Sequence, residues 1–365
     1  MPKISEVLAF LERFAPLNLA AEWDNVGLLL GDANRDCERI LTCLSISPLV
    51  VQEAIAERAN LIVSHHPVLF RGTKKLSSTS SDGRLLLPLL EAKIAVYSPH
   101  TAFDNCVGGI NDGIADRLKL QQVRPLRNRE GVRAFKLVVF VPEADLEKVS
   151  QALFAEGAGR IGNYEQCSFR TQGTGTFFGN EFTNPTIGTK GQREEVNELR
   201  LEVIVPEQQL TAVIQAMRSA HSYEEPAFDV YPLKALPGGG EGRFGILPEP
   251  VALSEFAEEV RQCLKANIVQ YVGDAKRKIS RIAVACGAAG EYLNDAKRAK
   301  ADVFLTGEVR FHDCLNAEQS EIALVLPGHY ATERPGIEDL AKRLETVFAS
   351  CKVWPSAREA DPLVS

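Results

Sequence analysis

Basic residues are in the minority in this chain, and long apolar runs are missing. The 41 lysines and arginines face 48 aspartates and glutamates, so the formal net charge is −7 and a nucleic-acid-binding surface is not expected. The longest apolar run, 40–51, is too short to cross a bilayer. The amphipathic segment 1–14 has no small-residue cleavage site, unlike a signal peptide. We therefore expect a cytoplasmic protein without nucleic-acid or membrane partners.

Several motifs that carry chemistry are also missing. None of the eight cysteines belongs to a C-x-x-C pair, which argues against a cysteine-type structural zinc site and indicates reduced thiols. No G-x-S-x-G elbow is present. The glycine turn at 287–290 lacks the spacing of a dinucleotide or P-loop fingerprint, so a tight turn is favoured there. Histidine is scarce, with six in the chain, yet two of them are adjacent at 65–66.

Strand and helix patterns alternate in the two outer parts of the chain, which predicts an α/β fold with a parallel sheet covered by helices. We assign 1–127 and 240–365 to two halves of this α/β domain. Segment 131–235 has the βαβ…βαβ order of an inserted α+β, ferredoxin-like domain. The glycine-dense stretch 237–245 is expected to be a flexible exit from it.

Polar side chains follow the predicted strands of the outer parts, and ligands bind at the carboxyl ends of such strands. The candidates at these ends are His65, His66, His100, Asp104, Glu308, His312, His329 and Glu333. For His100 and His312 taken singly, a structural, hydrogen-bonded histidine is an equally good interpretation. His221, in the inserted segment, is expected to have a structural or surface role.

Imidazole and carboxylate ligands suit Zn, Fe, Mn or Co better than Mg or Ca. Adjacent histidines at a strand end point to opposite sides, so His65 and His66 predict two ions with one histidine each. A shared carboxylate would hold such ions about 3.5–4 Å apart, as in two-metal hydrolases. Glu333 is the best candidate bridge, because a helix would place it on the same face as His329, four residues earlier.

Five motifs occur in an order that resembles a known family. They are EWDNVGLLLGD, SHHPVLF, PHTAFDNCVGGIN, FLTGEVRFHD and GHYATE. The set is similar to the dinuclear-metal family of GTP cyclohydrolase I type 2 homologues, also called the Ngg-interacting-factor-like family. The inserted segment, with HSYEEPA near its end, resembles the PII/CutA-like module of the longer members.

The resemblance implies a set of ligands and an assembly. His66 and Asp104 would bind one metal, His65 and His329 the other, and Glu333 would bridge both. His100, Glu308 and His312 match positions near the site and are candidates for proton transfer or for support of the ligands. The family's motif ends in TGE followed by paired His/His or His/Asp, and here Asp313 takes the second place. The resemblance also implies a ring-shaped homohexamer with the inserted domains over its openings.

The expected function is a metal-dependent hydrolase with two divalent transition-metal ions and a small-molecule substrate. The family resemblance implies opening of the guanine ring of GTP to a formamide. Two alternatives stay open: a two-metal nucleotide phosphoesterase, and a non-enzymatic ring protein that senses a metal or an effector. Arg71, Lys74, Lys75 and Arg310 are candidate phosphate contacts, although a solvated loop explains them equally well.

Overall fold

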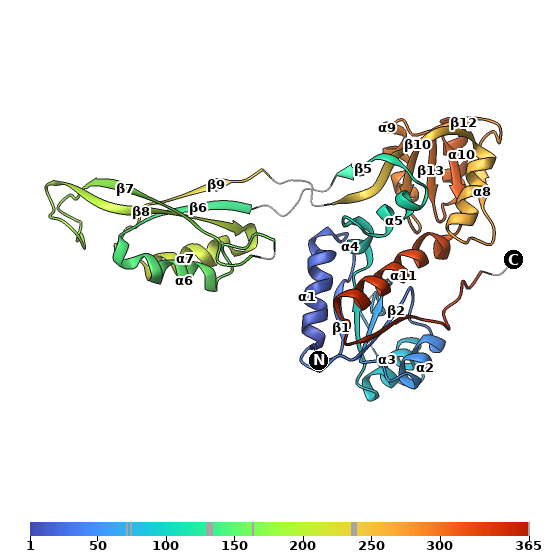
Figure 1. The fold of residues 1–365 in the computed structure, drawn as a ribbon, viewed down its shortest axis with the longest axis horizontal. Coiled ribbons are helices and arrows are strands. Elements are labelled where there is room, and N and C mark those ends of the chain that lie inside the picture. Colours follow the sequence, from blue (N-terminus) through green and yellow to red (C-terminus); the bar gives the residue numbers. More distant parts are fainter. Residues whose placement is uncertain (71, 74, 129–133, 163, 235–238, 364–365) are drawn as a thin grey trace. The chain divides into compact units, whose positions relative to one another are not determined.

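The computed structural model describes the chain except residues 71, 74, 129–133, 163, 235–238 and 364–365. The chain forms two compact units, one from 1–129 with 237–365 and the other from 130–236 (Figure 1). All eight cysteines are free thiols. Among the described helices, none combines the length and the apolar character needed to span a bilayer.

The first sheet of the larger unit contains five strands. In spatial order they are β1 (Gly27–Leu30), β4 (Ala95–Ser98), β3 (Leu61–Ser64), β2 (Arg39–Cys43) and β15 (Lys352–Pro355). All neighbours are parallel except β1, which runs antiparallel to β4. Every residue of β3 and β4 is buried, which explains their continuous apolar sequences. The helices that belong to this half are α1 (Ile4–Phe14), α2 (Pro48–Ala56) and α3 (Ser81–Glu91).

The second sheet of the larger unit contains six strands. In spatial order they are β11 (Gln270–Val272), β14 (Ala323–Leu326), β13 (Val303–Thr306), β12 (Lys278–Ala285), β10 (Gly240–Ala252) and β5 (Gln121–Asn128). Only β12, β13 and β14 are parallel, so the predicted parallel sheet is limited to the centre and antiparallel strands form its margins. The helices of this half are α8 (Leu253–Cys263), α9 (Leu293–Arg298) and α10 (Phe311–Gln319).

The prediction of a flexible exit at 237–245 is wrong from residue 240 onward, and 237–238 lie outside the described residues. This stretch begins strand β10, which pairs with β5 on one side and β12 on the other. The buried guanidinium of Arg243 donates hydrogen bonds to the Asp112 carboxylate and to three main-chain carbonyls. Pairing on both edges and this buried ion pair offset the entropic cost of ordering glycine, which local composition cannot reveal.

Three helices lie between the two sheets and join them into one unit (Figure 1). They are α4 (His100–Asn105), α5 (Ile110–Arg117) and α11 (His329–Val347). One apolar cluster contains Val63 of the first sheet, Leu305 of the second and Leu340 of α11. The carboxyl ends of both sets of parallel strands are thus built around shared helices.

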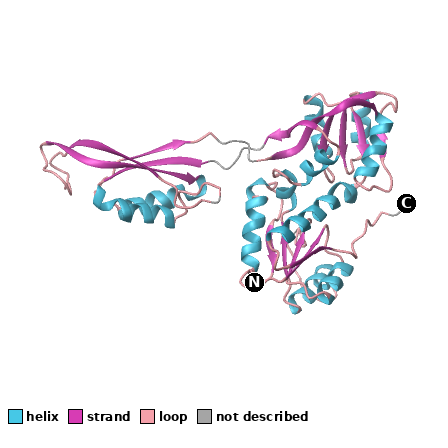
Figure 2. Cartoon of the chain, in the orientation of Figure 1, coloured by secondary structure: helices cyan, strands magenta, loops and turns pink. Residues whose placement is uncertain are grey.

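The smaller unit is a four-stranded antiparallel sheet with two helices on one face (Figure 2). Its elements follow the order β6 (Ala134–Val141), α6 (Leu146–Ala155), β7 (Phe169–Phe178), β8 (Arg193–Pro206), α7 (Leu210–Ala220) and β9 (Phe228–Pro232). The sheet order is β7-β8-β6-β9, as in the split βαβ arrangement. Alternate residues of β6, among them Leu137 and Val139, pack in the same cluster as the helices, which explains the period-two pattern of this strand.

Candidate metal centre

Strand β3 delivers the two adjacent histidines. Beyond its last residue, the main-chain amides of His65 and His66 still donate to the carbonyls of Cys43 and Leu44, over 2.9 and 2.8 Å. This continued pairing holds both residues in strand-like positions. The His65 ring is completely buried, and the His66 ring is partly exposed. One histidine therefore lies inside the unit and the other at the edge of a cavity.

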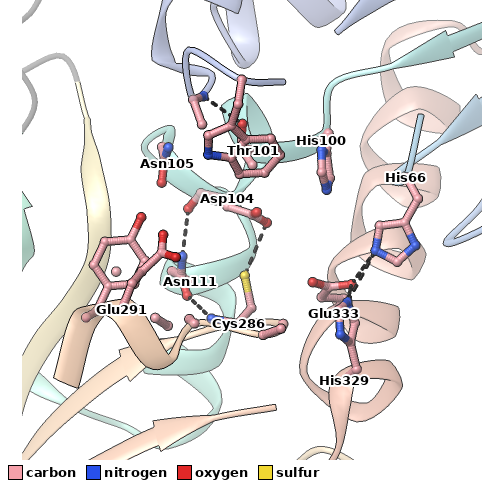
Figure 3. A pocket seen from close by; sticks show the side chains of 18 of the residues that line it. His66, His100, Thr101, Asp104, Asn105, Asn111, Cys286, Glu291, His329 and Glu333 are labelled. Carbon is pink, nitrogen blue, oxygen red and sulfur yellow. Dashed lines mark hydrogen bonds and ion pairs between the residues drawn. The ribbon is translucent and has the colours of Figure 1, made fainter. Parts of the chain in front are cut away.

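Helix α11 delivers the other pair. Strand β14 ends just before Gly328, whose φ of +100° is easily reached only by glycine, and the helix begins at His329. One turn later, Glu333 lies on the same face, and its Oε2 is 3.1 Å from His329 Nε2. The same oxygen is 3.0 Å from His66 Nε2, so one carboxylate meets ligand candidates from both sheets (Figure 3).

The side-chain contacts form two groups that share Glu333. In one, His65 Nε2 lies 3.5 Å from Asp104 Oδ1 and 3.7 Å from Glu333 Oε1. In the other, His66 Nε2 and His329 Nε2 are 3.3 Å apart and both contact Glu333 Oε2. The family resemblance pairs these histidines the other way, His66 with Asp104 and His65 with His329. In this structure, each oxygen of Glu333 faces one group.

The chemistry of these residues fits metal ions. Neither ring nitrogen of the buried His65 has a hydrogen-bond partner among the described residues, and the buried Glu333 Oε2 has ion-pair contacts but no hydrogen bond. Buried polar atoms are rarely left in this state unless they bind something else. His66, His329 and Glu333 form a group that could hold a metal ion, as do His65, His66 and His100. Three imidazoles and two carboxylates are a donor set for transition metals.

Hydrogen bonds from outside the cluster orient the exposed rings. His66 Nδ1 is 2.7 Å from Ser45 Oγ, and His329 Nδ1 is 2.9 Å from Glu308 Oε1. In both rings the Nδ1 contact leaves Nε2 directed at Glu333. The Ser45 segment is itself held by the carboxylate of Glu359, which accepts from the amides of Leu44 and Ser45. Partners of this kind fix the orientation of metal-binding histidines.

The clustered charges shift the pKa values of the ligand candidates in opposite directions. Burial alone would raise the pKa of Glu333, but the surrounding imidazoles hold it well below its usual value. Burial raises the pKa of Asp104, despite the opposing effect of His65. Burial lowers the pKa of His329, but the carboxylates of Glu333 and Glu308 outweigh it and raise that pKa to about 9. Glu333 is therefore ionised among the imidazoles, and the ionised carboxylate is the form that binds a metal ion.

The remaining candidates lie in three different surroundings. His100 opens helix α4, and its Nδ1 is 2.7 Å from Oδ1 of the buried Asp24. Its ring lies 5.1 Å from the His65 ring, centre to centre, so the structure brings His100 to the cluster. Glu308 lies next to these residues because its carboxylate contacts Nδ1 of His329. His312 is exposed in α10, stacks near Phe311 at 6.1 Å between ring centres and does not line the cavity.

The cluster of candidate ligands opens into a cavity of about 350 Å³. Its walls include Trp23, Phe70, Asn111, Cys286 and Glu291 besides cluster residues. Within the described part of the chain, no lysine or arginine lines it, and Lys75 and Arg310 are exposed elsewhere. The other two candidate phosphate contacts, Arg71 and Lys74, lie outside the described residues.

Sequence reasoning missed four residues that shape the site. Asp24 and Trp23 belong to the EWDNVGLLLGD motif, which served only as a family signature although its buried acid could have been suspected. Ser45 and Cys286 carry no local signal. The Cys286 thiol lies 3.2 Å from Asp104 Oδ1, and its amide donates to Asn111 Oδ1 over 2.9 Å. These contacts join β12 to α4 and α5 and exist only in the folded chain.

Comparison with known proteins supports the family resemblance. Residues 2–362 match the family model described as Duf34/NIF3 (NGG1p interacting factor 3). A Halalkalibacterium halodurans protein named GTP cyclohydrolase 1 type 2 homolog is 38% identical over 361 residues, 98% of this chain and 97% of the relative. A Bacillus subtilis protein of the same name is 38% identical over 327 residues, 89% and 88% of the two chains. The crystal structure of a Bacillus cereus protein related to NIF3 covers 100% of this chain and 99% of its own, with a TM-score of 0.78 and 35% identity.

Proposed function

This chain belongs to the Duf34/NIF3 family, and from that premise we propose that it is a dinuclear-metal-dependent hydrolase that acts on a nucleotide. The observation that carries the proposal is the shared carboxylate of Glu333, with one oxygen toward His65 and the other between His66 and His329. Two such groups around one carboxylate suit two adjacent ions. His65, Asp104 and Glu333 would hold one ion, and His66, His329 and Glu333 the other.

Two divalent ions supply a polarised, more acidic water, whose pKa falls toward about 7 at such sites. Zn, Fe, Mn and Co all suit the donor set. The protein's own contribution is to orient the rings and to exclude competing ligands. Ser45 and Glu308 keep Nε2 of His66 and His329 directed at Glu333, and the buried His65 is shielded from solvent.

We assign proton transfer to His100. Its Nδ1 faces the carboxylate of Asp24, which fixes the ring and leaves Nε2 to exchange a proton in the cavity. For GTP, the substrate suggested by the relatives' name, water adds to C8 of the guanine and the C8–N9 bond breaks, giving a formamide. The water oxygen becomes the formyl oxygen, and its two protons end on N7 and N9. His100 would take one of these protons from the water and return it to N9, while the other goes to N7.

The first test combines metal analysis with turnover of GTP, followed by the change in ultraviolet absorbance as the guanine ring opens. We expect about two ions per chain and formamide product. His100→Ala should keep the metal and lose about 10²- to 10⁴-fold in kcat. His312→Ala is the matched comparison, because the ring is exposed and away from the cavity; a comparable loss there would move proton transfer to His312.

Other outcomes would select the alternatives. Release of phosphate without ring opening would replace this proposal by a nucleotide phosphoesterase.

The sensing alternative has an observation of its own, because the inserted unit contains a separate cavity of about 530 Å³, lined in part by Phe177, Glu198 and Tyr223. We infer from the family resemblance that this unit is PII/CutA-like and that six chains form a ring. Metal-loaded protein that converts no nucleotide, yet changes assembly with an effector, would support sensing.

A further inference from the structure

Three aromatic rings lie together at the cavity next to the metal centre. Ring centres are 5.8 Å apart for Trp23 and Phe70, 6.0 Å for Trp23 and His100, and 6.5 Å for Phe70 and His100. All three residues line the cavity of the metal cluster. Trp23 is 60% exposed and Phe70 47% exposed, so two large apolar rings face open space rather than the core. Exposed aromatic rings at a mainly apolar cavity with a few convergent polar groups are typical of ligand contacts.

The backbone that carries these rings is anchored although the rings are exposed. The side chain of Asn25 donates to the carbonyl of Leu69 over 2.5 Å, which ties the Trp23 segment to the Phe70 segment. On the other side, the buried carboxylate of Asp24 accepts from Thr101 Oγ1 over 2.5 Å and contacts His100 Nδ1. The backbone that carries both rings is thus held in position before any ligand arrives, which reduces the entropic cost of binding.

The charge of the cavity limits what can lie against these rings. Its described walls carry the carboxylates of Asp104, Glu291 and Glu333 and neither lysine nor arginine. Asp104 and Glu333 belong to the proposed metal-binding groups, whose ions would offset their charge; away from those ions, a phosphate would meet Glu291 and no lysine or arginine of the described walls. The two ring planes are inclined at 62°, so a flat, uncharged heterocycle can stack on the face of one ring, contact the other at its edge and present its own edge to the candidate ligands.

We infer that Trp23 and Phe70 form a stacking platform for the heteroaromatic base of the substrate, with its sugar and phosphates directed out of the cavity. This inference rests on the proposed function for the identity of the ligand. It adds that recognition comes from the base, so that a nucleoside should bind about as well as its phosphates.

Intrinsic fluorescence tests the inference directly, because the chain has only two tryptophans. Trp354 stacks with Arg39 and Lys352, and its indole nitrogen donates to Glu53 over 3.2 Å, so it reports from a different place. We expect guanosine and GMP to quench emission of the zinc-loaded protein in a saturable way, and ribose 5-phosphate to leave it unchanged. Trp23→Phe should keep the Trp354 emission and lose this quenching.

Kinetics supply a second readout. Base stacking on an aromatic side chain corresponds to roughly 10- to 100-fold in affinity. Trp23→Ala and Phe70→Ala should raise KM by that factor with little change in kcat, while Trp23→Phe recovers most of the loss. Phe182→Ala is the control, since this ring is 88% exposed but belongs to the inserted unit.

The outcomes separate the inference from the proposed function. Quenching by guanosine without any turnover would support the platform and overturn the hydrolase. Turnover with an unchanged KM in both alanine variants would overturn the platform and leave the hydrolase. Equal quenching by ribose 5-phosphate would also overturn it, as would a change of oligomeric state in Trp23→Ala, which would identify the rings as a contact between copies of the chain.

Discussion

The two sheets of the larger unit supply the residues of the candidate metal centre in different ways. The first sheet places His65 and His66 directly on a strand that continues to pair with its neighbour, so the backbone itself positions these ligands. In the second sheet, strand β14 ends before Gly328, and helix α11 then carries His329 and Glu333 one turn apart. Neither sheet alone supplies enough ligand candidates for the two ions that we propose. The carboxylate of Glu333 contacts histidines from both halves and so joins their ligand candidates into one site.

The inserted unit offers a second comparison, between its buried histidine and the buried His65 of the larger unit. Its only histidine, His221, is buried, donates from Nε2 to the Phe140 carbonyl over 3.0 Å and accepts from the Tyr223 amide at Nδ1. Both ring nitrogens of His221 form hydrogen bonds within the protein. Neither nitrogen of the buried His65 has a hydrogen-bond partner among the described residues, and its Nε2 has only the longer contacts with Asp104 and Glu333. The structural role expected for His221 is confirmed. A satisfied buried histidine supports a fold, and an unsatisfied one indicates a ligand.

The largest effect should come from removing the shared carboxylate. Glu333→Gln eliminates the negative charge that faces both groups, so we expect loss of both ions, measured as metal per chain after dialysis. Glu345→Gln is the matched control on the same helix, because Glu345 is exposed. If Glu333→Gln retained two ions, the two metal sites would be independent of Glu333, and its role as a shared ligand would be contradicted.

A smaller effect, the loss of one ion, distinguishes the two possible pairings. In this structure His65 belongs with Asp104, so His65→Ala, Asp104→Asn and their combination should each leave about one ion per chain. His65→Ala combined with His329→Ala should leave none. The pairing implied by the family resemblance predicts the reverse. His65→Ala with Asp104→Asn would then leave no ion, and His65→Ala with His329→Ala would leave one.

The smallest effect concerns the link between the C-terminal segment and helix α2. The buried carboxylate of Glu53 accepts hydrogen bonds from Ser356 Oγ and from the amides of Ala357 and Arg358. Burial raises the pKa of Glu53, but these bonds outweigh it and hold that pKa below its ordinary value of 4.5. Glu53→Gln should lower the free energy of unfolding by roughly 1–3 kcal/mol at pH 7.

The sign of the pH dependence follows from the lowered pKa. Glu53 stabilises the folded state above pH 4.5, and this contribution is lost as the pH falls through the lower folded-state pKa. The difference between wild type and Glu53→Gln in thermal or urea unfolding should therefore narrow below pH 4.5. A difference that stays constant down to pH 3 would mean that the carboxylate charge contributes nothing.

Local sequence was sufficient wherever a residue's role depends on its near neighbours. The continuous apolar run before His65 predicted β3, and the spacing of His329 and Glu333 predicted one helical face. The βαβ…βαβ order of the inserted segment also followed from periodicity. These features depend on residues that are only a few positions apart, so the spacing of apolar and polar residues along the chain is enough to predict them.

Tertiary structure decided everything that depends on pairing across the chain. Strand β10 forms because β5 and β12 satisfy both of its edges, against the preference of its glycines. Ser45 becomes the partner of His66, and His65 faces Asp104, because folding brings separate loops to one point. The residue types of the candidate metal centre could therefore be predicted from the sequence. The pairing of its ligands is decided by packing, since distances between side chains arise only when both sheets close on the shared helices.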